Sequence, residues 1–303
     1  MKFGKRHPVP VYPGKISADH FNIGALMADS LLGPITLSAK VDGSGFTLND
    51  LNAKVDAEVD ELYLNDYTYH HITTQGTFDK KLYNGLLQVA DSNLVLNFTG
   101  AVDFNGELPA FQFRSEVLKS DLRALRLTTD SITYSGKLDL NIQGNSIDNF
   151  TGDARMYDIN LFKSKTRIAF DTLVVHSGPD SSGGKSLTVR GNEVEGFLKG
   201  DYDLGDMGEA IQNFGHRYFP SLFQAPASRV PVKENFVFGL KLGNADKVLP
   251  YFMKGLSGMD NSQFSGSMNT LTDSLNLAAD VPELGYDKYQ FNDISLRVGG
   301  EAE

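Results

Sequence analysis

The chain lacks cysteine and tryptophan altogether among its 303 residues, and it lacks any long apolar run. Without cysteine, disulfide bonds, zinc–thiolate sites and thiol nucleophiles are excluded. Without tryptophan, the side chain that best supports an exposed sugar platform is missing. No segment reaches the roughly 18 consecutive apolar residues that a membrane-spanning helix needs. These absences exclude several kinds of site but leave the fold open.

Positive charge is also scarce, because 28 lysine and arginine residues stand against 38 aspartate and glutamate residues, for a net charge of −10. Nucleic-acid binding depends on clustered cations that neutralise phosphates, so we expect no nucleic-acid partner. An anionic membrane surface is disfavoured as the main partner for the same reason. The basic start at Lys2, Lys5 and Arg6 is too short to reverse this balance.

What the sequence has in abundance is alternation of apolar and polar residues. Residues two apart share a face of a β-strand, so residues 132–143 present apolar side chains on one face and polar ones on the other. Turn-forming residues separate many such segments. We therefore predict a mostly-β fold, a long curved antiparallel sheet with one apolar side, resembling a U-shaped groove. The predicted strands lie at 14–22, 34–42, 53–64, 67–78, 84–90, 94–104, 110–118, 132–143, 153–162, 167–176, 186–191, 194–204, 235–242, 262–269, 274–281 and 289–299.

Two local patterns refine this picture. The apolar positions alternate through residues 53–59 and then change parity at Leu62 and Leu64. A slip of one residue predicts a bulge or bend in that strand. In addition, residues 67–72 (Tyr-x-Tyr-x-x-Ile) share their spacing with residues 289–294 (Tyr-x-Phe-x-x-Ile), which suggests a strand-pair unit used more than once.

Two short amphipathic helices are expected to interrupt the strands. Asp206 is placed to cap the first, which should end or kink before Pro220 because proline breaks a helix interior. The second begins at Asn244 and should be bent or brief because Pro250 follows. A further short turn of helix is expected near residues 22–27. The apolar stripe of the first helix, which could cap or plug one end of the groove, consists of Met207, Ile211, Phe214, Tyr218 and Leu222.

These helices suggest a division of the chain into three parts. The first is a β-rich groove segment, 1–204, and the second is a helical insertion with a loop and a strand, 205–256. The third is a continuing β segment, 257–303. We expect all three to form one continuous elongated unit.

No pattern that carries catalysis or metal binding is complete. The glycine-rich stretch 178–186 departs from phosphate-loop spacing and lies between strands rather than before a helix. His70 and His71 are adjacent in a predicted strand, so they point to opposite faces. The carboxylates between Asp56 and Asp60 share one strand face, which fits a solvated face better than a calcium site or an acid–base pair. We therefore assign no catalytic residue, no metal site and no enzymatic activity.

Several short motifs follow one another along nearly the whole chain. They are Leu-Gly-Pro-Ile-Thr-Leu at 32–37, Val-Asp-Gly-Ser-Gly-Phe-Thr-Leu at 41–48, Leu-Asn-Ala-Lys-Val-Asp at 51–56, Leu-Asn-Asp-Tyr-Thr-Tyr-His-His-Ile at 64–72, Phe-Leu-Lys-Gly-Asp-Tyr-Asp-Leu at 197–204, Tyr-Phe-Pro-Ser-Leu-Phe at 218–223, Asn-Ala-Asp at 244–246 and Tyr-Gln-Phe at 289–291. In this order they resemble the TamB (translocation and assembly module) family of the bacterial AsmA-like superfamily, as found in Bacteroidetes.

The resemblance implies a periplasmic β-sheet bridge that carries phospholipid between the inner and outer membranes. It implies an inner-membrane anchor and a BamA-like outer-membrane barrel partner (TamA), with this chain as an interior segment. It implies no catalytic residues and no cofactor, although a phospholipid or fatty acyl chain could be bound. The residues expected to line the apolar groove are Leu94, Leu96, Phe98, Val102, Phe104, Leu138, Leu140, Ile142, Phe236, Phe238 and Leu240.

Two alternatives remain open on the sequence. The chain could be a scaffold or chaperone that offers strand edges to nascent outer-membrane proteins. It could also be a plain two-layer β-sandwich with an ordinary core, acting structurally or binding carbohydrate.

Overall fold

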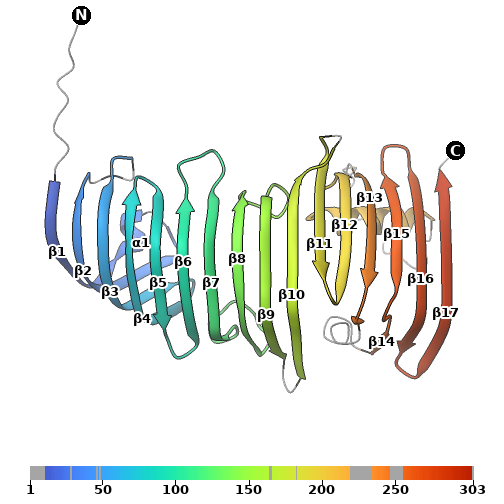
Figure 1. Ribbon diagram of the computed structural model, residues 1–303, viewed down its shortest axis with the longest axis horizontal. Coiled ribbons are helices and arrows are strands. Elements are labelled where there is room, and N and C mark those ends of the chain that lie inside the picture. The colour runs from blue at the N-terminus through green and yellow to red at the C-terminus, as the bar shows by residue number, and fades with distance from the viewer. Residues whose placement is uncertain are drawn as a thin grey trace, which may run out of the picture. The chain divides into compact units, whose positions relative to one another are not determined.

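A computed structural model describes residues 11–27, 29–45, 47, 49–163, 166–181, 183–218, 234–245 and 255–301. Within these residues the protein is mostly β, with one open antiparallel sheet of 17 strands and two short helices (Figure 1). The predicted fold class is confirmed in these terms. The alternative of a closed two-layer sandwich is wrong, because the strands belong to a single open sheet.

The chain forms two compact units. Unit 1 comprises Met1–Asn141 with Asp158–Arg167, and unit 2 comprises Ile142–Tyr157 with Ile168–Glu303. The predicted boundaries at 204 and 256 stay a prediction. The elements up to β8 are β1 (Val11–Asn22), α1 (Ile23–Met27), β2 (Leu32–Ser44), β3 (Asn52–Leu64), β4 (Tyr67–Asp79), β5 (Leu82–Ala90), β6 (Leu94–Asp103), β7 (Ala110–Asp121) and β8 (Ile132–Gln143).

Most strands pair with the strand that precedes them in the chain. In unit 1, β1 to β7 pair successively and antiparallel. In unit 2 the succession runs from β10 to β13 and continues through β15, β16 and β17, while the short β14 pairs with β16. These elements are β9 (Thr151–Lys163), β10 (Thr166–Pro179), β11 (Lys185–Gly191), β12 (Val194–Asp201), α2 (Met207–Tyr218), β13 (Asn235–Leu242), β14 (Leu256–Gly258), β15 (Gln263–Asn269), β16 (Ser274–Tyr286) and β17 (Tyr289–Glu301).

The predicted slip in β3 is confirmed as a bulge. In the pairing with β2, Leu37 lies opposite Val59 and Thr36 lies opposite Glu61, so β3 has one extra residue between them. On the neighbouring strand β4, His71 has a φ of 53°. Left-handed φ is unusual outside glycine and marks a local break in the strand. Because of the break, Leu62 packs against the same buried cluster as Val59, although the two are three residues apart.

The internal repeat is supported by register and backbone angle. In unit 2, Val281 lies opposite Ile294, and Glu283 lies opposite Asn292. The residue before Ile294, Asp293, has a φ of 53°, which is the value found at the matching position of unit 1. Both units therefore contain a hairpin whose second strand has a left-handed residue just before the isoleucine of the Tyr-x-aromatic-x-x-Ile spacing.

The buried core of each unit is small. The cluster in unit 1 consists of Ile35, Val59, Ile72 and Val89, and the cluster in unit 2 consists of Leu198, Tyr202, Phe236 and Met268. In the described part of the chain, 16 apolar side chains are buried while 18 large ones are exposed. A single sheet with so little sealed core leaves apolar surface available on its faces.

The first predicted helix is confirmed as α2, whose described residues are Met207–Tyr218, and the predicted end before Pro220 lies at the border of the described residues. The carboxylate of Asp203, rather than that of Asp206, accepts the N–H groups of Gly205 and Asp206, at 2.9 and 3.1 Å. The turn of helix near residue 22 is confirmed as α1. The second predicted helix, from Asn244, lies mostly outside the described residues.

Candidate functional site

The apolar face of unit 1 is built from directly opposed side chains. Val59, Ile72, Val89 and Leu96 face one another across β3, β4, β5 and β6. Opposed pairs on one face of an antiparallel sheet have Cβ atoms about 5 Å apart, so these four form a continuous row. Ile23 of α1 packs against the same cluster and covers one end of the face.

The next row along the strands is more open. Leu87 and Phe98 lie opposite each other on β5 and β6, and both side chains are half-buried. The rings of Phe98 and Phe113 have centroids 4.9 Å apart, which continues the apolar surface onto β7. Leu94 and Leu96, also predicted to line the groove, pack against the buried cluster.

One row of this face consists of glycines, and a tyrosine ring lies over them. Gly76, Gly85 and Gly100 lie directly opposite one another on β4, β5 and β6. A Cβ atom on Gly85 would lie 2.6 Å from the Cα atom of Gly76 and 2.7 Å from the hydroxyl of Tyr83. That hydroxyl is held 2.6 Å from Thr74 Oγ1, so the tyrosine ring lies over glycines that have no room for a side chain.

Beyond the glycine row the surface is again apolar. Val102 of β6 lies opposite Tyr83 and Phe111, and its side chain is half-buried. Phe104 follows the end of β6, where it is 52% exposed and its ring centroid lies 6.0 Å from that of Phe111. It is therefore the most open of the predicted groove residues.

The apolar face of unit 2 follows the same plan. Leu198 lies opposite Phe238, and Phe236 lies opposite Met268. Phe236 is only 5% exposed, and Met207 at the start of α2 is among the side chains that pack against its cluster. Phe236 is thus part of a sealed core, Phe238 packs at its edge, and Leu240 at the far end of β13 is exposed.

The other predicted site residues take varied positions. Leu138, Leu140 and Ile142 lie on β8 and are half-buried. On the predicted stripe of α2, only the side chain of Met207 lies within the described residues. The side chains of the remaining stripe residues lie outside them, namely Ile211, Phe214, Tyr218 and Leu222. The groove-lining and capping roles therefore stay predictions.

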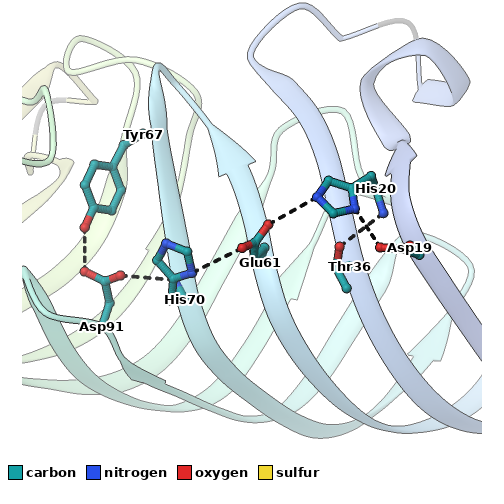
Figure 2. Close-up of polar contacts among 7 residues, drawn as sticks. All are labelled: Asp19, His20, Thr36, Glu61, Tyr67, His70 and Asp91. Carbon is teal, nitrogen blue, oxygen red and sulfur yellow. Dashed lines mark hydrogen bonds and ion pairs between the residues drawn. The ribbon is translucent and has the colours of Figure 1, made fainter.

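A row of polar side chains crosses unit 1 beside the bulges (Figure 2). His20 Nε2 and His70 Nδ1 lie 3.7 and 3.9 Å from the two carboxylate oxygens of Glu61. Asp19 Oδ1 lies 2.6 Å from the other ring nitrogen of His20, and the His20 N–H donates to the hydroxyl of Thr36. These contacts link β1, β2, β3 and β4 at the level where the strands break.

The row continues to a buried carboxylate. Asp91 is 3% exposed and accepts hydrogen bonds from the Tyr67 hydroxyl at 2.6 Å, the Asn93 N–H at 2.7 Å and the His70 N–H at 3.1 Å. Burial acts to raise the pKa of Asp91, but the bonds from Tyr67, Asn93 and His70 outweigh it and lower the pKa. A carboxylate with this many donors holds the β4–β5–β6 connections together.

A second buried carboxylate lies in unit 2. Glu234 is 1% exposed, and both of its oxygens accept the N–H of Asp203, at 3.2 and 3.3 Å. Burial raises the pKa of Glu234, and the nearby carboxylates of Asp203 and Asp206 raise it further. The geometry ties the start of β13 to the turn that precedes α2.

The described residues offer no metal centre, since no group of three or more histidines and carboxylates among them could hold an ion. Across the same residues, no helix has both the length and the apolar character needed to cross a membrane. The carboxylates between Asp56 and Asp60 are exposed, in line with the expected solvated face. Comparisons with protein-family models, with curated proteins and with solved structures found no match.

Sequence reasoning missed the polar row and both buried carboxylates. His20, Glu61 and His70 come from three separate strands, and only the register of β1 to β4 brings them together. A signal was available for Asp91 alone, because an aspartate in a Ser-Asn turn between two apolar strands commonly accepts local backbone bonds.

Proposed function

We propose that this chain is a non-enzymatic lipid-binding segment that holds the acyl chains of phospholipids against the apolar faces of its units. The observation that carries the proposal is the open row on unit 1, where Leu87, Phe98 and Phe113 are only half-buried beside a sealed cluster. Apolar side chains in continuous rows, left partly accessible, offer an acyl chain an apolar surface along which to lie.

The strength of such binding can be bounded. Burying a methylene group fully is worth about 0.8 kcal/mol, and one open face covers roughly half of its surface. A chain of about sixteen carbons would then gain about 6 kcal/mol, which corresponds to a dissociation constant in the range of 10⁻⁵ to 10⁻⁴ M. Binding of this strength would hold a lipid and still release it, as a carrier must.

The resemblance to the TamB family supports a proposed location and proposed partners. On this proposal the chain works in the periplasm, between an inner-membrane anchor and an outer-membrane barrel partner. Phospholipid then passes from one apolar row to the next without entering water. The competing function is a scaffold for outer-membrane proteins, which would use strand edges rather than the apolar faces.

The proposal is tested with two neighbouring residues on β6. Phe98 lies on the apolar face and Thr99 lies on the opposite, exposed face. We expect Phe98→Glu to weaken binding of a fluorescent sixteen-carbon fatty acid by tenfold or more, because a carboxylate then stands in the path of the chain. Thr99→Glu should leave the affinity unchanged. Equal affinity of both variants and the parent chain would refute the proposal. If the chain then crosslinks to unfolded outer-membrane barrel strands, the scaffold function is favoured.

A further inference from the structure

The polar face of unit 2 carries a hollow that lipid binding does not use. It has a volume of about 470 Å³ and is lined by side chains from β11, β12, β13, β15 and β16. We call it the Phe197 hollow, after the exposed ring at its edge. The side chains that define it are Arg190, Phe197, Lys199, Lys241, Gln263 and Ser265.

The hollow exists because three small residues follow Phe197 in one row across the sheet. Gly239, Ser265 and Ala278 continue this row from Phe197, each directly opposite the next on neighbouring strands. The phenyl ring lies over Gly239, since a Cβ atom there would come within 2.5 Å of Phe197 Cε1. Phe197 is 42% exposed, so a flat apolar surface borders a shallow floor of small residues.

Positive charge surrounds this floor. Lys199 Nζ lies 5.5 Å from the centroid of the Phe197 ring. Lys241 and Arg190 lie on the row below, on either side of Glu195. Among the described residues, no hydrogen bond or ion pair engages the side chains of Arg190, Lys199 or Lys241, so all three remain available to a ligand.

The local charge runs against that of the whole chain. Asp280 at the far edge is neutralised by Arg297, whose Nη2 lies 2.8 Å from Asp280 Oδ2. Three cations against Glu195 leave a net charge of about +2 at the hollow, in a protein whose net charge is −10. A local reversal of this kind attracts anionic ligands to one place on the surface.

We propose that the Phe197 hollow binds an acidic saccharide, with a sugar ring against the phenyl ring and a carboxylate between the lysines. A sugar ring presents an apolar C–H face that packs on an aromatic ring, and its hydroxyls need polar partners such as Gln263 and Ser265. Alternate rows are about 7 Å apart along a strand, so the Lys199 and Lys241 rows span roughly 13 Å around the floor, enough for one sugar ring with its carboxylate. Phe197 supplies the aromatic surface for the sugar ring, which would be larger with a tryptophan at this position.

The face of the sheet decides between a sugar and a lipid headgroup. Phe197 and Lys199 point to the side opposite Leu198, which lies in the buried cluster of the apolar face. A phospholipid held by its phosphate in the hollow would have its acyl chains on the polar face, where Phe197 and Val237 are the exposed apolar side chains near it. The hollow therefore serves a ligand without acyl chains.

The proposal is tested by titrating the full chain with a galacturonic acid trisaccharide, and in parallel with a neutral glucose trisaccharide and with inorganic phosphate. We expect the acidic trisaccharide to bind at least tenfold more tightly than either. Phe197→Ala should weaken it about three- to tenfold, the range for loss of one aromatic contact. The double variant Lys199→Gln, Lys241→Gln should abolish the preference for the acidic sugar.

Val237→Ala is the matched control, because Val237 is 47% exposed on the same face but does not line the hollow. This variant should bind like the parent chain. Three results would each overturn the proposal. These are equal affinity for the neutral sugar, equal affinity for inorganic phosphate, and unchanged binding by Phe197→Ala with its circular dichroism spectrum intact. Absence of binding at millimolar acidic trisaccharide would overturn it as well.

Discussion

Exchanging Leu87 or Leu86 for glutamine distinguishes the two faces of the sheet with a single side-chain change at adjacent positions. Leu87 packs against the buried cluster of unit 1, whereas Leu86 is 48% exposed on the other face. We expect Leu87→Gln to destabilise unit 1 and Leu86→Gln to leave its free energy of unfolding nearly unchanged.

The magnitude follows from burial. Full burial of a leucine side chain is worth about 1.5–3 kcal/mol, so a half-buried Leu87 contributes roughly 1 kcal/mol. Placing the glutamine amide against the apolar cluster without a partner costs about 1 kcal/mol more. The sum is about 2 kcal/mol for Leu87→Gln, whereas an exposed substitution such as Leu86→Gln is usually within about 0.5 kcal/mol.

Urea unfolding followed by circular dichroism measures this difference. At a slope of about 2 kcal/mol/M, Leu87→Gln should lower the midpoint of unit 1 by roughly 1 M. Equal midpoints for the two variants would refute the assignment of the faces. A larger loss for Leu86→Gln would show that the register of β5 is wrong, because a slip of one residue exchanges the faces.

Two further predictions concern unit 1. Tyr67→Phe removes one bond to the buried Asp91 and should cost about 1–2 kcal/mol at pH 7. Because the folded pKa of Asp91 is lowered, the bonds to its charged form stabilise the fold above the unfolded pKa and lose this effect as pH falls through the folded pKa. The difference between variant and parent should therefore shrink below about pH 4, and a difference that grows in acid would contradict this account. Gly85→Ala should cost about 1–3 kcal/mol in urea unfolding because its Cβ atom meets Gly76 and Tyr83, while Gly14→Ala, in open space on β1, should be neutral. Equal effects at the two glycines would show that the close approach of β4 and β5 is not required.

Much of the fold could be predicted because strand alternation is a local signal. Residues 235–242 and 274–281 are predicted as strands from their own alternation, and the parity change at Leu62 predicted a bulge that the register of β2 and β3 confirms. The strand β14 was missed, since three residues are too few to show a period. The extent of burial along β13 could not be predicted from the sequence, because side chains from distant segments, Met207 among them, pack against the cluster that contains Phe236.

The candidate sites depended on register more than on local pattern. The cations of the Phe197 hollow lie at positions 190, 199 and 241, and no spacing along the chain connects them. They meet because Arg190 lies opposite Glu195, and Glu195 lies opposite Lys241. An acidic chain can thus carry a cationic surface that composition alone would exclude.

The most direct test of the central claim is to map where a phospholipid touches the protein. A phospholipid with a photoreactive group near the end of its acyl chain would be incubated with the purified full chain, irradiated, and located by mass spectrometry of peptides. The account predicts crosslinks to apolar-face residues such as Leu87, Phe98 and Phe113, and none to Leu86 or Thr99 on the opposite face of the same strands. Crosslinks spread equally over both faces, or confined to the polar face, would contradict it.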